Sequence, residues 1–160
     1  MSKPFALYLV VAACMTAMSI PIAATQAQEL SGSPGLVDAE AAIDACLAHR
    51  RDGKLPPLAV AVVDGRGQLV ALKREDGALP VTAEVAILKA RTAQRTGLPS
   101  SAFRSGSEAD ATLRDTLLQL QLTAMPGGVP LPRASGGVGV SGATPEDDEA
   151  CALRAVARDG

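Results

Sequence analysis

The sequence predicts a single α+β domain, and three observations lead to this prediction. The chain has 160 residues, a length that suits one domain. Several segments repeat apolar residues at the helical period, and several others are apolar runs of strand length between Gly, Pro and Asp turns. Hydrophobic residues make up 48% of the chain and charged residues 20%, which fits a folded globule rather than a disordered chain.

The first 27 residues predict a secretory signal peptide. Lys3 precedes an apolar run over residues 5–22, and small residues end the segment before Gln28. The apolar run is short for a membrane-spanning helix, so a retained anchor is the weaker alternative. We therefore expect residues 28–160 to form one domain that is periplasmic or secreted, without membrane attachment after cleavage.

The composition of residues 28–160 excludes some partners. This part has 14 basic and 17 acidic residues, a net charge near −3, and Phe103 is its only aromatic residue. Proteins that hold single-stranded nucleic acid combine a basic groove with several aromatic side chains on which bases stack. Nucleic-acid binding is therefore not expected.

A helix and a β-hairpin open the domain. A helix over residues 38–51 buries one face, and Asp52–Gly53 ends it. The apolar run at residues 58–64 and the segment at residues 68–74 predict a β-hairpin around a Gly-rich turn. Since the first strand is almost continuously apolar, we expect it to be central and covered on both faces. The buried helix face is made of Ala39, Ala42, Ile43, Cys46 and Leu47.

A second helix is expected from Thr82, as its N-cap, to about Arg95. Lys89 lies on the alanine-rich face of this helix. The residue either snorkels, with its stem on apolar surface and its amine in water, or has a binding or subunit-contact role. Both alternatives stay open at this point.

The rest of the chain predicts a loop at residues 97–106, a helix at residues 108–122 and two short strands at residues 129–132 and 137–141. Prolines place the first of these strands at a sheet edge. The helix is expected to have a Leu113, Leu117 and Leu120 stripe.

The last helix is marked by Thr144 as N-cap and Pro145 at the first position. Its inner face is expected to contain Cys151, Ala152, Ala155 and Val156. Cys151 and Cys46 thus both lie on apolar helix faces, either bridged in an oxidising compartment or as two buried free thiols.

The stretch GVGVSG at residues 137–142 fits the dinucleotide-binding pattern G-x-G-x-x-G. The helix that follows opens with four acidic residues at positions 146–149, which would repel a phosphate from its positive end. Glycines at alternate positions 137 and 139 leave one strand face bare for a close approach by a helix or another subunit. We therefore predict a packing role for this run. The sequence also lacks a P-loop, a complete nucleophile elbow, a metal-ligand cluster and the Cys-x-x-Cys-His of covalent haem.

Four segments together resemble the GlcG/HbpS family of haem-binding proteins. They are AVVDGRGQLVALKREDGA, AILKARTA, GGVPLP and GVGVSGATPEDDEACA, in the family's order and approximate spacing. The resemblance implies a profilin-like antiparallel sheet flanked by helices in a single compact domain that assembles into homo-oligomers. It also implies non-covalent haem binding, because some members bind haem. The positions that match family motifs are Arg74, Asp76, Lys89, Thr92, Gly127, Gly128 and Pro130.

Three further residues bear on the site. His49 is the strongest axial haem ligand by chemistry, although it lies off the buried face of its helix. Glu75 stands where the family usually has an apolar residue, and Arg95 where an aromatic residue is common.

We expect an exported, non-enzymatic haem-binding or haem-responsive protein. One alternative is a periplasmic accessory subunit that packs its glycine strand and alanine-rich helices against a protein partner and has no ligand of its own. The other is a small-molecule enzyme that uses Asp64, Arg74 and Asp76, but no pair of nucleophile and base can be assembled from this sequence.

Overall fold

A computed structural model describes residues 32–132 and 135–157. The predicted signal peptide lies outside these residues. The described chain forms one compact unit around a four-stranded antiparallel sheet with the strand order β2-β1-β4-β3. The strands are β1 (Ala59–Asp64), β2 (Leu69–Arg74), β3 (Gly128–Pro130) and β4 (Gly136–Ser141).

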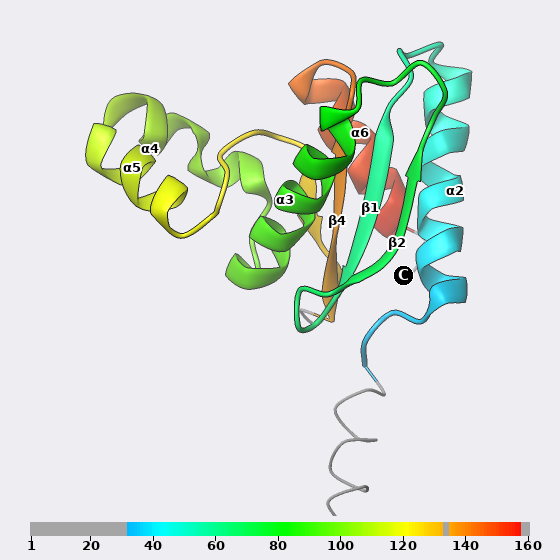
Figure 1. Cartoon of the computed structure of the whole chain (residues 1–160), viewed down its shortest axis with the longest axis horizontal. Coiled ribbons are helices and arrows are strands. Elements are labelled where there is room, and N and C mark those ends of the chain that lie inside the picture. Colours follow the sequence, from blue (N-terminus) through cyan, green and yellow to red (C-terminus); the bar gives the residue numbers. More distant parts are fainter. Residues whose placement is uncertain (1–31, 133–134, 158–160) are drawn as a thin grey trace, which may run out of the picture. The chain divides into compact units, whose positions relative to one another are not determined.

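Helices cover both faces of the sheet (Figure 1). Helix α3 (Val81–Thr96) lies on one face, and helices α2 (Leu36–Asp52) and α6 (Pro145–Val156) lie on the other. Between α3 and β3 the chain forms a short 3-10 turn (Ser100–Phe103), α4 (Arg104–Ala109) and α5 (Ala111–Gln119). This arrangement confirms the predicted α+β class and the antiparallel sheet flanked by helices.

Strand β1 is central, as its apolar sequence predicted. Val60 and Val62 belong to the core under α2 and α6, whereas Ala59 and Ala61 pack with Ala86 of α3. All of these side chains are fully buried. The hairpin to β2 is closed by Asp64, whose Oδ1 accepts hydrogen bonds from the backbone N–H groups of residues 66 and 68, each at 2.8 Å.

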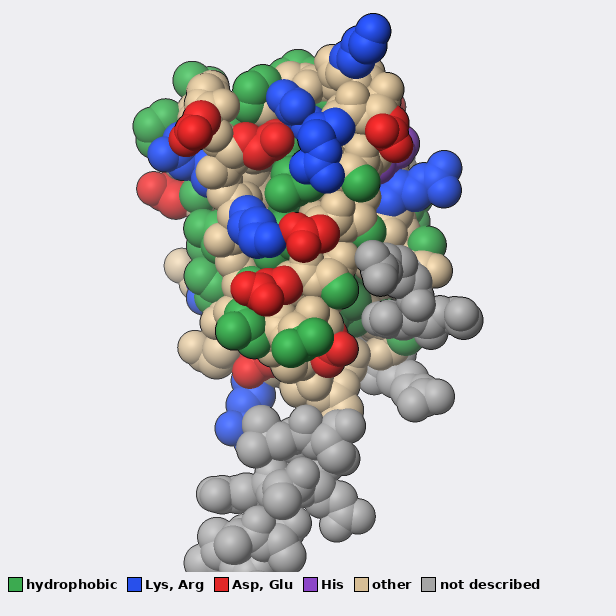
Figure 2. Space-filling model, turned by 90° about the vertical axis from the view of Figure 1, so that its right-hand side faces the viewer, with side chains coloured by type: hydrophobic (Ala, Val, Ile, Leu, Met, Phe, Trp, Pro, Cys, Tyr) green, Lys and Arg blue, Asp and Glu red, His purple; other side chains and the backbone are tan. Residues whose placement is uncertain are grey.

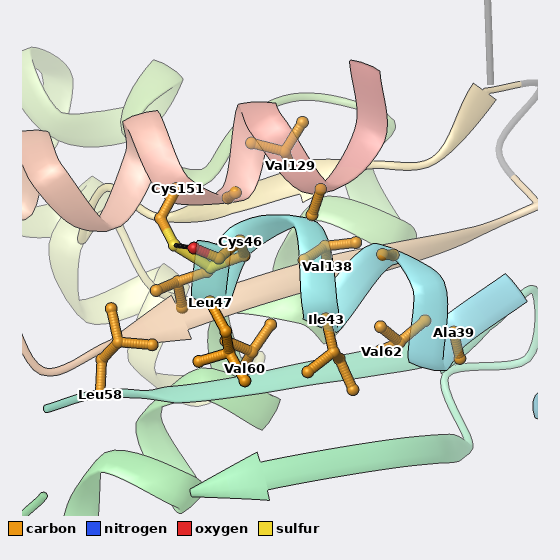
Figure 3. Close-up of a cluster of buried hydrophobic side chains, with 14 of the residues drawn as sticks. Ala39, Ile43, Cys46, Leu47, Leu58, Val60, Val62, Val129, Val138 and Cys151 are labelled. Atoms are coloured by element: carbon orange, nitrogen blue, oxygen red, sulfur yellow. Dashed lines mark hydrogen bonds between the residues drawn. A yellow bond between two sulfur atoms is a disulfide. The ribbon is translucent and has the colours of Figure 1, made fainter. Parts of the chain in front are cut away.

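A disulfide joins Cys46 of α2 to Cys151 of α6 across 105 residues of sequence. Figure 3 shows the bond within the main core, where Ile43 and Leu47 lie over Val60 of β1. Both cysteines are fully buried. The bridged alternative is therefore the one that the structure contains. The bond fastens together the two helices that cover this face of the sheet.

Glycines in β4 let helix α3 approach the sheet closely. A Cβ atom on Gly137 would collide with the carbonyl oxygen of Ala90, and one on Gly139 with the carbonyl oxygen of Ala86. The backbone N–H nitrogen of Ala90 would also lie only 2.5 Å from a Cβ at position 139. The predicted packing role of GVGVSG is confirmed, and the partner is a helix of the same chain.

Two helix predictions were wrong in detail. Helix α3 begins at Val81 after Pro80, and Thr82 donates its hydroxyl to the Leu79 carbonyl at 2.7 Å instead of capping the helix. The segment expected as a loop at residues 97–106 already contains the 3-10 turn and the first half of α4. The helix expected over residues 108–122 is split, because Asp110 adopts an extended conformation and caps α5 through Thr112. Only Leu117 of the predicted leucine stripe is buried.

The other boundaries agree with the sequence. Helix α6 starts with Pro145 at its first turn, and the hydroxyl of Thr144 accepts a hydrogen bond from the Asp147 N–H at 3.2 Å. Strand β3 lies at the sheet edge, as its prolines predicted.

The face of the molecule around α2 and β2 has a mixed charge distribution. Figure 2 shows Lys and Arg side chains interspersed with Asp and Glu on this face, with hydrophobic side chains between them. None of the helices within residues 32–132 and 135–157 is long and apolar enough to span a bilayer.

Gly139→Ala should lower the free energy of unfolding by about 1–3 kcal/mol, because the added methyl group has no space against the α3 backbone. Gly32→Ala is the matched control, since a Cβ there would have no atom within 4 Å. Urea unfolding followed by circular dichroism measures both. Equal stabilities of the two variants would contradict this packing.

Candidate functional site

A buried ion pair connects the two layers of helices through the sheet. The Lys89 Nζ lies 2.8 Å from Asp148 Oδ2 and donates a second hydrogen bond to the Val140 carbonyl, also at 2.8 Å. Both side chains are 4% exposed. The other carboxylate oxygen of Asp148 accepts the backbone N–H of Ala143 at 3.0 Å. The two charges therefore have partners, as charges in a protein interior require.

The position of each charge follows from helix geometry. Lys89 lies on the buried face of α3 with Ala86, Ala90 and Ala93. Asp148 lies on the inner face of α6, three and four residues before Cys151 and Ala152. From the sequence alone, Asp148 is one of four acidic residues in the first turn of this helix. Its spacing to the buried face of α6 was the signal that could have separated it from them.

Two glycines make room for this ion pair. A Cβ atom on Gly127 would lie 2.8 Å from the Val140 carbonyl oxygen and 3.0 Å from Lys89 Nζ. A Cβ on Gly128 would collide with the Lys89 carbonyl oxygen. Gly127 also has a φ of +113°, a conformation that other residues rarely adopt. The segments GGVP, KARTA and PEDDEACA, which are far apart in the sequence, thus meet at one point.

Burial raises the pKa of the Asp148 carboxyl group, because desolvation disfavours its charged form. The hydrogen bond and the charge of Lys89 act in the opposite direction, as does the N–H of Ala143. The carboxylate thus depends on Lys89 for much of its stabilisation.

A hollow with a volume of about 430 Å³ opens beside the ion pair, and we call it the main hollow. Lys89 and Asp148 both contribute to its wall. The rest of its lining is largely apolar. The apolar side chains of the lining are Pro56, Pro57, Ala78, Leu79, Val81, Val85, Met125, Pro126, Ala143 and Pro145.

A second hollow, of about 310 Å³, lies next to the first, and we call it the α5 hollow. The two share Met125, Pro126 and Pro145. The α5 hollow has an apolar floor and a charged rim of Arg104, Glu108 and Arg114. Its floor is formed by Leu117, Leu118, Leu122, Ala124 and the three shared residues.

The structure brings only some of the predicted site residues together. Lys89 lines the main hollow, but its amine is held inside by Asp148, so the snorkelling interpretation was wrong. Arg74 donates to the Ala78 carbonyl at 2.6 Å and so fixes the turn that forms one wall. Asp76 is an exposed residue of the same turn.

Thr92 and His49 lie elsewhere. Thr92 is fully buried, donates to the Leu88 carbonyl and accepts the N–H of Thr123, so its hydroxyl is used within the fold. His49 is half-buried on α2 and lines neither hollow. Roles of these residues as ligands remain predictions.

Both residues that depart from the family pattern have structural partners. Glu75 accepts the N–H of Leu58 and forms an ion pair with Arg50, with Nε and Oε2 3.1 Å apart. Arg95 donates to the carbonyl of Leu120 at 2.6 Å, which holds the end of α5 against α3. No group of three His, Cys, Asp or Glu side chains that could hold a metal ion occurs in the described part of the chain.

The fold and the site define a small α+β domain. In it, glycines of the sheet allow a helix to pack closely, and an apolar hollow lies beside a buried ion pair. Over residues 35–157 the sequence matches the family described as "Haem degrading protein HbpS-like". The chain belongs to this HbpS-like family, which confirms the resemblance seen in the sequence.

Solved structures of related proteins agree with this assignment. A crystal structure of HbpS is 30% identical, covers 80% of this chain and 91% of its own, and has a TM-score of 0.70. A double mutant of HbpS from Streptomyces reticuli is 31% identical, with coverages of 80% and 88% and a TM-score of 0.69. The structure named PduOC:Heme Complex is 26% identical, with coverages of 78% and 94% and a TM-score of 0.69. No curated protein sequence matches the chain.

Lys89→Met should lower the free energy of unfolding by about 3–5 kcal/mol at neutral pH, because it leaves the Asp148 carboxylate buried without its partner. In this variant desolvation still raises the pKa of Asp148, while the opposing effect of Lys89 is lost. At a pH near or below 3.8, the ordinary pKa of an aspartate carboxyl group, Asp148 is protonated in the unfolded chain too. The penalty for burying its unpaired charge then disappears. As the pH rises above 3.8, the folded chain holds the proton longer than the unfolded chain does, and stability falls.

Chemical unfolding between pH 4 and pH 7 measures this effect. The double variant Lys89→Met/Asp148→Leu is the control, since it removes both charges and should show a smaller loss at pH 7 without the pH dependence. Equal losses of stability in the single and double variants at every pH would show that Lys89 does not stabilise a buried Asp148 carboxylate.

Proposed function

We propose that this protein binds haem non-covalently in the main hollow. The observation that carries the proposal is the apolar hollow of about 430 Å³ in a domain of the HbpS-like family. Ligand sites of this kind are concave, mostly apolar and between about 300 and 1,000 Å³ in volume. The similar structure of PduOC in complex with heme supports the same ligand class.

The side chains of the hollow fit a porphyrin better than a small polar ligand. Apolar side chains from four separate segments line it, and they would contact the faces of the macrocycle. The ion pair keeps one wall rigid, because both of its charges are already satisfied inside the protein. Arg74 contributes by holding the turn at Ala78 in place.

Met125 is the residue of the main hollow whose side chain belongs to the common axial ligands of haem iron. Met125 is 46% exposed and lines both hollows. When bound, haem would supply an iron that can change its oxidation state, and Met125 is the lining residue that would hold this iron. His49, the residue that chemistry alone favoured, does not line the hollow.

We further propose that the protein is exported and works outside the cytoplasm. The N-terminal sequence has the three regions of a secretory signal, and the fully buried Cys46–Cys151 disulfide is of the kind that persists in oxidising compartments. Two independent features of the chain therefore support the same location.

Haem degradation is the second candidate function, and the description of the family favours it. Binding and degradation differ in what happens to the bound haem over time. A haem that is only held keeps its absorbance, whereas a degraded haem loses its Soret band.

Titration of the purified protein with haemin should give a saturable Soret band. Val81→Glu should weaken haemin binding about tenfold, equivalent to about 1.4 kcal/mol, because a carboxylate at the wall of the main hollow disfavours a largely apolar ligand that carries two carboxylates. Val37→Glu is the matched control. Both valines are exposed residues in the first turn of a helix, but residue 37 lines neither hollow.

The absence of a saturable band at micromolar haemin would refute haem binding. Equal weakening of haemin binding by Val81→Glu and Val37→Glu would refute the main hollow as the haem site. Following the band for an hour after adding a reductant separates the two functions. A stable band supports binding alone, and loss of the band supports degradation.

Expression of the full sequence in an export-competent host should give a periplasmic or secreted protein with the mass of residues 28–160 less two hydrogens, since cleavage and oxidation both occur. Under denaturing, non-reducing conditions a thiol-alkylating reagent should add no mass. Reduction should make both cysteines reactive. Recovery of the uncleaved chain with alkylated Cys46 and Cys151 would contradict export.

A further inference from the structure

The two hollows meet along a single ridge. Met125, Pro126 and Pro145 contribute to both linings, so a ligand that rests on this ridge touches both. Among the described residues that line the main hollow, Lys89 is the one cation, and it is already paired with Asp148. A ligand with both apolar and anionic parts therefore finds its apolar surface in the main hollow and its cationic partner beyond the ridge.

Arg114 is the available cation of the α5 hollow. Its side chain lines this hollow from the exposed side of α5, and it forms no ion pair or side-chain hydrogen bond with another residue in the described ranges. A guanidinium group binds a carboxylate through two parallel N–H donors, which makes arginine well suited to this kind of ligand.

The other arginine of the rim is already occupied. Arg104 lies 3.2 Å from Glu108 and 3.0 Å from Glu146, measured from guanidinium nitrogen to carboxylate oxygen. The hydrogen bonds that Arg104 donates to Glu146 and Glu108 raise the pKa of its guanidinium group. This group of three has one net negative charge, and Glu108 faces the α5 hollow together with Arg114.

We propose that haem lies across the ridge, with its macrocycle in the main hollow and one propionate carboxylate bound by Arg114 in the α5 hollow. This inference rests on the proposed haem binding and adds the residue that orients the ligand. It assigns a role to the α4–α5 excursion, which otherwise lies outside the helix–sheet layers (Figure 1). Glu108 opposes the same carboxylate by charge repulsion.

Haemin and its dimethyl ester test the inference, because the ester has the same macrocycle without the two negative charges. Arg114→Ala should weaken haemin binding about threefold to tenfold, as expected for one partly exposed charge pair, and leave binding of the ester unchanged. Arg154→Ala is the matched control. It removes one exposed positive charge from α6, at a position that lines neither hollow.

Glu108→Gln gives a second, opposite readout. Removal of this carboxylate from the rim should strengthen haemin binding by about twofold to fivefold and again leave the ester unchanged. Both effects should diminish as the salt concentration rises, since exposed charges are screened.

The outcomes separate the inference from the function on which it rests. If neither haemin nor its ester binds to the wild-type protein, haem binding itself is refuted, and the inference falls with it. If both ligands bind and Arg114→Ala changes neither, or changes both equally, haem binding stands and the propionate contact is refuted.

Discussion

The ion pair between Lys89 and Asp148 is the constraint on which the rest of the structure depends. It joins α3, on one side of the sheet, to α6 on the other, and it also engages the Val140 carbonyl of β4 between them. A charge pair at this depth requires dense packing and complete hydrogen bonding around it. The two glycines before β3 supply the space, and the chain before α6 supplies the Ala143 N–H. Motifs that look unrelated in the sequence are therefore parts of one arrangement.

Much of the fold could be predicted from the sequence, because periodicity and turn residues act locally. The central β1 strand, the edge position of β3 and the capped start of α6 all follow from residues within a few positions of each other. The split between α4 and α5 could not be predicted in this way. It depends on the extended backbone of Asp110, which no repeat in the sequence marks.

The site could be predicted only in part. Lys89 was recognised as unusual, because a lysine on an alanine face needs an explanation, but its partner is 59 residues away and belongs to another helix. The hollows are formed by residues from the segments around Pro57, Leu79, Met125 and Pro145, which meet only in the folded chain. Arg114 has no motif around it. Its proposed role depends on the residues that line the α5 hollow with it, and these come from distant parts of the sequence.

The disulfide has a consequence for the order of events during biosynthesis. Cys46 lies in the first helix of the described domain and Cys151 in the last, so the bond cannot close until almost the whole domain has been made. Before that moment Cys46 has only Cys14 as a cysteine partner within its own chain. Removal of the N-terminal segment would therefore also remove both incorrect pairings that the sequence permits, Cys14–Cys46 and Cys14–Cys151. The cleavage step and the fidelity of oxidation would then be linked in a single polypeptide.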